Sequence, residues 1–260
     1  MKNEKHGNAT LSRRTFFKTT GAAGLGAALA PVLGAGRAHA ATPEKDADTT
    51  GVPTRAFGRT GIQVPILSLG GMFDIPSNQT MLKQAVRWGV TYWDTAHTYS
   101  GGRSEEGIGQ YFSRYPEHRE KIFLVTKSTK RHPDGLSREL ETSLKRMRTD
   151  YIDLFFVHAI RDIEVMGSRI RDWAREQKAA GKIRFMGFST HSNMEACLLG
   201  AARMDWIDGI MMTYNFRLMN EDRMKAAVTA CVDAGIGLTA MKTQGGGGVK
   251  TDSARELELA

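Results

Sequence analysis

The stretch Tyr92–Tyr99 reads Y-W-D-T-A-H-T-Y and places a carboxylate and a phenol five residues apart, where a strand opens into a loop. The apolar and β-branched run from Val90 to Trp93 predicts a buried strand, and the residues after Asp94 predict the turn that leaves it. Asp94 therefore stands at the carboxyl end of the strand. In α/β folds this is the end where ligands bind, because the strand-to-helix loops gather there. A strand-end Asp can equally cap a loop, so the neighbouring strands decide between the two interpretations.

Two more reactive side chains close the next two apolar runs. Lys127 follows the run Ile122–Thr126, and His158 follows the run Ile152–Val157. Because the carboxyl ends of successive parallel strands meet at one edge, we expect Asp94, Lys127 and His158 to lie together, with Tyr99 over them. These four side chains are the predicted catalytic residues.

Strand-like runs recur about every thirty residues, which is the size of one βα unit. They lie near residues 68, 93, 124, 155, 185, 211 and 238, and each precedes a segment of helical periodicity. The predicted helices are Asn78–Trp88, Ser104–Phe112, Ser137–Met147, Gly167–Ala180, Met194–Met204 and Glu221–Ala234. A short hairpin at Arg55–Gly61 is expected before the first core strand, Val64–Gly70.

Strict strand–helix alternation fits either a closed (β/α)8 TIM barrel or an open doubly wound sheet. The barrel is favoured, because no G-x-G-x-x-G motif follows the first strand and seven near-equal units exceed a typical doubly wound sheet. The seventh strand ends near Met241, and nineteen residues follow it. We therefore expect an α/β barrel whose last βα unit is missing from this chain, which is either a fragment of a longer product or a truncated gene product.

The N-terminus carries a targeting signal. Ser12–Lys18 reads S-R-R-T-F-F-K, a weakly apolar stretch follows to Leu33, and Ala38-His39-Ala40 supplies a small-x-small cleavage site. The predicted organisation is a twin-arginine signal peptide at 1–40, a polar linker at 41–54 and the barrel at 55–260. The expected partner is the twin-arginine export machinery. The expected location is the periplasm, with membrane anchoring if the signal is uncleaved.

Charge and cysteine content exclude several classes of function. Residues 1–40 hold six Lys or Arg and one Glu, so removing them from 36 basic and 28 acidic residues leaves 30 and 27, a net charge of +3. With no basic run interleaved with aromatic residues, nucleic-acid binding is not expected. Cys197 and Cys231 form no C-x-x-C motif; they are expected to be buried, and a disulfide between them stays open. No metal set emerges.

Three nearby polar residues and the tryptophans, all outside the predicted catalytic set, have simpler interpretations. His97 is expected to be a solvent-facing loop residue and His191 a helix-start residue, while Asp153 is expected to be a structural hydrogen-bond partner. The tryptophans are expected to pack in the core, with one of them able to line a pocket.

The four predicted catalytic side chains suit proton delivery to an oxygen. A phenol is a poor acid at neutral pH, and an ammonium beside it makes its proton easier to give away. Lys127 can supply that charge, Asp94 can orient the lysine, and His158 can donate a hydrogen bond to the same oxygen. This layout suits reduction of a carbonyl, and since no side chain donates hydride, a nicotinamide or a flavin is required.

Several motifs together resemble the aldo-keto reductase family. They are R-A-F-G-R-T-G-I-Q-V at the hairpin, W-D-T-A-H-T-Y with S-E-E-G-I-G after it, L-V-T-K, and Y-I-D-L-F-F-V-H, and the match covers residues 55 to about 245. The resemblance implies an eightfold barrel that binds NADP(H) and reduces aldehydes or ketones. It also implies that Tyr99 is the proton donor of a tetrad with Asp94, Lys127 and His158.

The same resemblance suggests cofactor contacts. Ser189 and Thr190 stand where the family usually has Ser-Asn against the carboxamide, Met211 stands where a Gln is common, and Met241 stands where many members stack a Tyr on the nicotinamide. Gly245, Gly246 and Gly247, in Q-G-G-G-G-V after the seventh strand, are expected to wrap a phosphate unless they belong to a flexible tail.

Three choices stay open at this point. NADP(H) rather than NAD(H) rests on the family alone, and oligomeric state leaves no trace in the sequence. The alternatives to a reductase of a small carbonyl substrate are a nicotinamide-binding redox or regulatory module and an inactive remnant.

Overall fold

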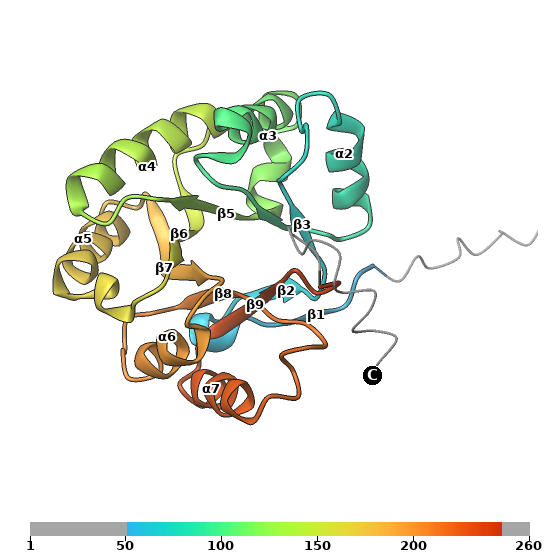
Figure 1. Ribbon diagram of the computed structural model, residues 1–260. Helices are drawn as coiled ribbons and strands as arrows, with labels where there is room; N and C mark the ends of the chain where they lie inside the picture. The colour runs from blue at the N-terminus through green and yellow to red at the C-terminus, as the bar shows by residue number, and fades with distance from the viewer. Residues whose placement is uncertain (1–50, 246–260) are drawn as a thin grey trace, which may run out of the picture. The chain divides into compact units, whose positions relative to one another are not determined.

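The computed structural model describes residues 51–245, and their centre is a seven-stranded parallel sheet (Figure 1). The strand order β3-β4-β5-β6-β7-β8-β9 follows the sequence, so each strand pairs with the next one along the chain. The strands are β3 (Ser68–Gly70), β4 (Tyr92–Asp94), β5 (Phe123–Ser128), β6 (Ile152–Ile160), β7 (Ile183–Thr190), β8 (Gly209–Thr213) and β9 (Gly237–Met241). All seven predicted strands are present, and sequential parallel order is the arrangement of a barrel wall.

Helices connect the strands and lie outside the curved sheet (Figure 1). They are α2 (Gln79–Arg87), α3 (Arg103–Arg114), α4 (Pro133–Met147), α5 (Ser168–Ala179), α6 (Met194–Ala201) and α7 (Asp222–Asp233), with short 3-10 turns η2 (Tyr99–Gly102), η3 (Pro116–Lys121) and η4 (Ile163–Met166). Helix α4 begins four residues before its predicted start. Pro133 suits a first helical position, and His132 caps the helix by accepting from Gly135 N–H.

An antiparallel hairpin precedes the sheet, and it corrects one predicted boundary. Strand β1 (Thr54–Ala56) pairs with β2 (Gln63–Pro65) across the turn η1 (Gly58–Thr60). The predicted strand Val64–Gly70 is therefore wrong as one element, because its first two residues belong to the hairpin and the core strand starts only at Ser68. The hairpin pairing extends beyond Pro65, because the Ile66 N–H donates to the Pro53 carbonyl.

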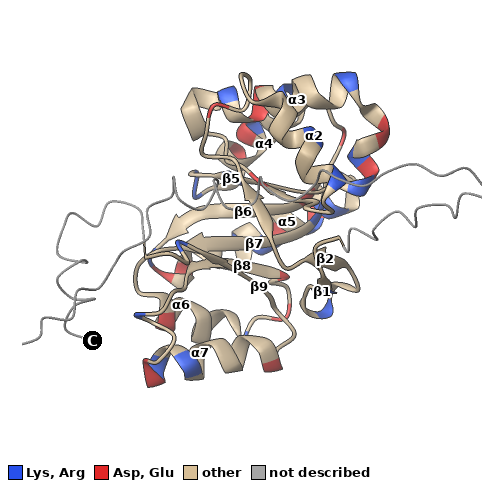
Figure 2. Ribbon diagram, turned by 90° about the vertical axis from the view of Figure 1, so that its right-hand side faces the viewer, with Lys and Arg blue, Asp and Glu red and all other residues tan. Residues whose placement is uncertain are grey.

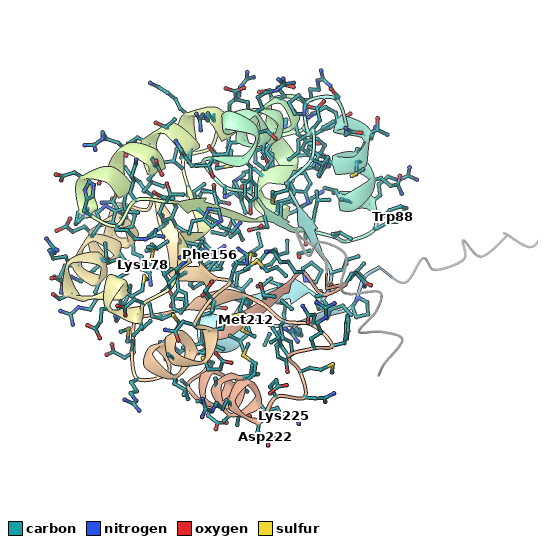
Figure 3. All side chains as sticks on the ribbon, viewed as in Figure 1. Trp88, Phe156, Lys178, Met212, Asp222 and Lys225 are labelled. Atoms are coloured by element: carbon teal, nitrogen blue, oxygen red, sulfur yellow. The ribbon has the colours of Figure 1, made fainter. Side chains whose placement is uncertain are left out.

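Alternation along the strands separates two apolar clusters. One cluster, on the inner face, contains Phe57 of the hairpin, Tyr92 and Phe156. The other lies between the sheet and the helices and includes Trp93 and Met212. Figure 3 labels Phe156 and Met212, one from each cluster. Since side chains of a strand point alternately to its two faces, every second residue is committed to the inner face.

The outer surface is formed by the helices, where most charged positions gather, while the strands are mostly uncharged (Figure 2). Trp88, expected in the core, is instead 59% exposed after α2, and Figure 3 shows it at the periphery. Asp153 fulfils its expected structural role: its carboxylate accepts from Arg119, Arg184 and the Leu124 N–H.

Some sequence-based expectations concern residues outside the described range, and others concern membrane spans, metal sites and a disulfide. The signal peptide, residues 41–50 of the linker, Gly246 and Gly247 lie outside the described residues. Within 51–245, no helix is both long and apolar enough to cross a membrane, and no group of three His, Cys, Asp or Glu side chains could hold a metal ion. Cys197 and Cys231 are both buried free thiols.

Candidate active site

Strand alternation brings the predicted catalytic residues to the inner face of the sheet. Tyr92 points inward, so Asp94 two residues later does too, and both are buried. Lys127 lies two residues beyond the inward-facing Val125, and His158 lies two residues beyond Phe156. In the parallel register Asp94 pairs with Val125 and Lys127 pairs with Phe156, so each successive group sits slightly further along the axis.

Lys127 is the centre of the site. Its ammonium is fully buried, donates to Asp94 Oδ2 at 2.7 Å and to the Thr95 carbonyl at 2.7 Å, and lies 2.6 Å from Asp94 Oδ1. It also lies 3.4 Å from the Tyr99 hydroxyl. Burial raises the pKa of Asp94 above its ordinary value, and the Lys127 ammonium opposes that rise. A buried cation is thus held in contact with both the carboxylate and the phenol.

His158 faces the same phenol from the next strand. The rings of Tyr99 and His158 are 5.8 Å apart in an edge-to-face arrangement. Burial first, and then the positive charge of Lys127, lower the pKa of His158 from 6.5 to about 4. His158 is therefore a neutral imidazole at pH 7, and its buried Nδ1 atom has no hydrogen-bond partner.

A bulge in β6 directs His158. The register of β6 with β7 shifts between Val157 and Ile160, and Ala159 adopts a left-handed conformation with φ 54°. The Ala159 N–H donates to Ser189 Oγ at 2.9 Å, and Arg131 donates to the carbonyls of His158 and Ala159. Bulges of this kind commonly re-aim a side chain beside an active site.

A cavity of about 740 Å³ opens in front of these groups. Tyr99 and His158 line it together with Met211 and Met241. Neither Ser189 nor Thr190 belongs to its lining: Ser189 Oγ is taken up by the bulge, and Thr190 points outward, where its hydroxyl donates to the Ser192 carbonyl. Gly245, the last described residue, has φ 72° and lies near Phe216.

Four polar residues of the site were not assigned to it from the sequence. His191 and Lys242 line the cavity, and His191 Nδ1 lies 3.0 Å from the Thr213 hydroxyl. His97 is not solvent-facing, because its side chain is only 18% exposed, near Glu139, and Arg146 holds its carbonyl. The positions of Lys242 and His191 directly after a strand are weak signals in the sequence. The contact between residues 97 and 146 has no such signal.

Comparison with known proteins identifies the family. The model described as "Aldo/keto reductase family" matches residues 67–259, which is well over half of the chain. The chain belongs to the aldo/keto reductase family. The seven parallel strands in sequential order agree with this assignment, and so the expectations of family and barrel-type α/β fold are both confirmed.

The individual relatives of this chain within the family are distant. The chain is 33% identical over 158 residues to "Aldo-keto reductase yakc [NADP(+)]" of Schizosaccharomyces pombe, covering 53% of this chain and 45% of that protein. It is 28% identical over 216 residues to the oxidoreductase YrpG of Bacillus subtilis, covering 74% and 66%. The thermostable aldo-keto reductase Tm1743, solved with the inhibitor epalrestat, superposes with a TM-score of 0.62 at 28% identity, covering 80% of this chain and 78% of that one. The chain thus spans about half to two thirds of these curated relatives' length.

The lining of the cavity can be compared with the parts of a nicotinamide cofactor. Met211 and Met241 give it an apolar wall opposite Tyr99 and His158, and its volume lies in the range of small-molecule sites. A volume of about 740 Å³ is large enough to admit a planar ring such as a nicotinamide. The side chains expected at the carboxamide are less suited, because Thr190 faces away and Met211 offers no amide.

Proposed function

We propose that this protein reduces an aldehyde or ketone with hydride from NADPH. The observation that carries the proposal is the buried Lys127 ammonium, which contacts the Asp94 carboxylate and lies 3.4 Å from the Tyr99 hydroxyl at the wall of the cavity. A phenol held against a fixed cation is arranged to release a proton at the moment when negative charge builds on a substrate oxygen.

Each of the four side chains has a distinct part in this proposal. The Tyr99 O–H donates its proton to the carbonyl oxygen, and Lys127 stabilises the phenolate that remains. Asp94 keeps the lysine charged and oriented through its ion pair with the ammonium. When bound, the nicotinamide supplies the hydride that completes the reduction. Met211 and Met241 shield the reacting carbon from water.

His158 acts in this scheme as a hydrogen-bond donor and not as an acid. Its pKa of about 4 keeps the ring neutral at pH 7, and a neutral imidazole carries one N–H. With Nδ1 buried and without a partner, the proton belongs on Nε2, from where it can be donated to the substrate oxygen. The substrate oxygen then receives a hydrogen bond from His158 and a proton from Tyr99.

Turnover tests the proposal directly. Purified protein with NADPH and a panel of aldehydes and ketones is followed at the absorbance band of reduced nicotinamide, with NADH in parallel to separate the two cofactors. Tyr99→Phe is expected to lower kcat by about 10²- to 10⁴-fold. Tyr115→Phe, a partly buried phenol on the outer side of the sheet, is the matched control and should retain activity.

Two results would contradict this function. Equal activity of the Tyr99→Phe variant and the wild type would remove Tyr99 as proton donor. Tight retention of the nicotinamide with no turnover of any carbonyl would instead favour a redox or regulatory module.

We propose further that the protein is exported, on the strength of the twin-arginine motif at Arg13-Arg14. Replacing both residues by Lys should leave the protein in the cytoplasm, measured by cell fractionation with and without the change. An unchanged periplasmic fraction would show that a different signal directs it.

A further inference from the structure

The loop that carries Tyr99 is fixed through the backbone of His97. We refer to residues 95–102 as the proton-donor loop. The His97 N–H donates to the Lys127 carbonyl at 2.9 Å, and the His97 carbonyl accepts from Arg146 Nη1 at 3.0 Å. Tyr99 follows two residues later, with its own N–H bonded to the Ala96 carbonyl. The position of the phenol is thus set by a residue whose backbone N–H and backbone carbonyl are both held.

Arg146 reaches this loop from α4 and is paired on the way. Its Nη1 lies 3.1 Å from Glu105 Oε2, and Glu105 has no exposed side-chain surface. The other carboxylate oxygen of Glu105 accepts from the Thr126 hydroxyl at 2.7 Å. A buried carboxylate needs such partners, because an uncompensated charge in the interior is strongly unfavourable. Glu105 therefore holds the Arg146 guanidinium within hydrogen-bonding distance of the His97 carbonyl.

Residues at the start and in the middle of α3 contact Arg146. Gly102 immediately precedes α3, and Glu105 and Gly109, four residues apart, lie on one face of the helix. A Cβ atom on Gly102 would lie 2.4 Å from Arg146 Cζ, and one on Gly109 would lie 2.0 Å from the Arg146 carbonyl oxygen. The two glycines thus leave room for the arginine, and the carboxylate between them pairs with it. This accounts for Gly102, Glu105 and Gly109 of the motif G-R-S-E-E-G-I-G, which the proposed chemistry leaves unused.

The segment after Tyr99 needs such support. Ser100, Gly101 and Gly102 all have positive φ values, 52°, 67° and 100°. A serine in this conformation carries backbone strain, and strained segments persist only where the surroundings hold them. Among the contacts of this segment, the guanidinium of Arg146 against Gly102 is the one that also reaches the His97 carbonyl.

We propose that Arg146 is a positioning residue for the proton donor and that Glu105 holds it in place. Arg146 touches none of the four predicted catalytic side chains; it acts through the His97 peptide to keep the Tyr99 hydroxyl beside Lys127. This inference rests on the proposed function, since it assigns a role in proton delivery by Tyr99. It predicts a defect in kcat and not in binding, because the cavity wall formed by Met211 and Met241 is untouched.

The first test separates positioning from folding. Arg146→Met leaves the Glu105 carboxylate buried without its cation, so the double variant Arg146→Met with Glu105→Gln is made beside it to remove that charge. The double variant is expected to fold, with thermal stability closer to the wild type than the single variant. Its kcat should still fall about 10²-fold, as expected for a displacement of about 1 Å, with KM and the NADPH Kd within twofold of wild type.

Chemical rescue of kcat distinguishes positioning from a purely structural role, because an added small cation would not repair a folding defect. In Arg146→Ala, added methylguanidinium should restore kcat several-fold, whereas methylammonium, which lacks the planar donor fork, should not. Arg138→Met is the matched control, because Arg138 lies on the same helix with its side chain exposed.

The outcomes are distinguishable. A wild-type protein without turnover removes the proposed function and this inference together. An active wild type whose double variant keeps kcat within twofold, or loses kcat and cofactor affinity in parallel, removes this inference alone.

Discussion

The two halves of the cavity rim are built differently. On the rim of β4–β6, Asp94, Lys127 and His158 are held by buried hydrogen bonds, a bulge and an ion pair, and β5 is buried along its whole length. On the rim of β7–β9, Met211 and Met241 line the cavity together with His191, Thr239 and Lys242, and β9 is buried only at Gly237. The difference indicates that proton chemistry is preorganised by the fold, while the ligand-binding wall depends on few specific contacts.

The largest effect is expected from Lys127→Met, which breaks the first rim at its centre. It leaves the Asp94 carboxylate buried without its cation, which costs about 3–5 kcal/mol of unfolding free energy. It also removes the charge that stabilises the phenolate, so kcat/KM should fall by about 10³-fold or more. Urea unfolding and steady-state kinetics measure the two effects. Lys130→Met, a half-exposed neighbour, serves as control, and equal behaviour of the two variants would contradict the comparison.

The neutral His158 should give the protein a pH-dependent stability. Its pKa is about 4 when folded and about 6.5 when unfolded, so between these values the unfolded chain binds more protons. Stability should therefore rise with pH from 4 to 6.5 and be lost as pH falls through that window. Discounted for the partial exposure of the ring, the contribution is about 1–2 kcal/mol.

Urea unfolding at pH 4.5 and pH 7 checks this dependence. In His158→Gln the slope attributable to this ring should vanish. The pKa of His191 is also lowered, first by burial and then by the charge of Lys242. His191→Gln therefore serves as the comparison on the second rim. An unchanged slope in His158→Gln would show that the ring is not held neutral by the fold.

A substitution on the rim of β7–β9 is expected to strengthen cofactor binding, which tests whether that rim lacks specific contacts. Met211→Gln supplies an amide on the inner face of β8, where family resemblance expects a carboxamide contact. One added hydrogen bond of about 1 kcal/mol should tighten the NADPH Kd by about 5- to 10-fold, measured by fluorescence titration. Met219→Gln, on an exposed methionine, should leave the Kd unchanged. A weaker Kd for Met211→Gln would mean that the apolar wall itself carries the affinity.

The smallest effect concerns the left-handed residue at the end of a strand on each rim, Ala159 and Lys242, with φ 54° and 56°. Glycine adopts this conformation without strain but loses more entropy on folding, so Ala159→Gly should raise the unfolding free energy by at most about 1 kcal/mol. Its kcat should stay within twofold of wild type, because Ser189 and Arg131 still hold the bulge. Lys242→Gly gives the matched gain on the other rim. A large loss of kcat in Ala159→Gly would show that the alanine itself directs His158.

Sequence reasoning succeeded where one local rule applies along a strand. The two-residue period that buries Tyr92 and Phe156 also commits Asp94 and His158 to the inner face, and the order of βα units brings the strand ends together. It failed where the deciding partner is far away in the chain. His97 looked solvent-facing because Arg146, forty-nine residues later, is invisible in its neighbourhood.

The sequence by itself therefore determined the repeating strand–helix order, the face on which each strand residue lies and the family of the chain, because periodicity and motifs are local. Only the tertiary structure decided the register shift that turns Ala159 toward Ser189 and the arginine that holds the proton-donor loop. These depend on hydrogen bonds between segments brought together by packing, and the strength of such bonds is set by a distance that no spacing in the chain encodes.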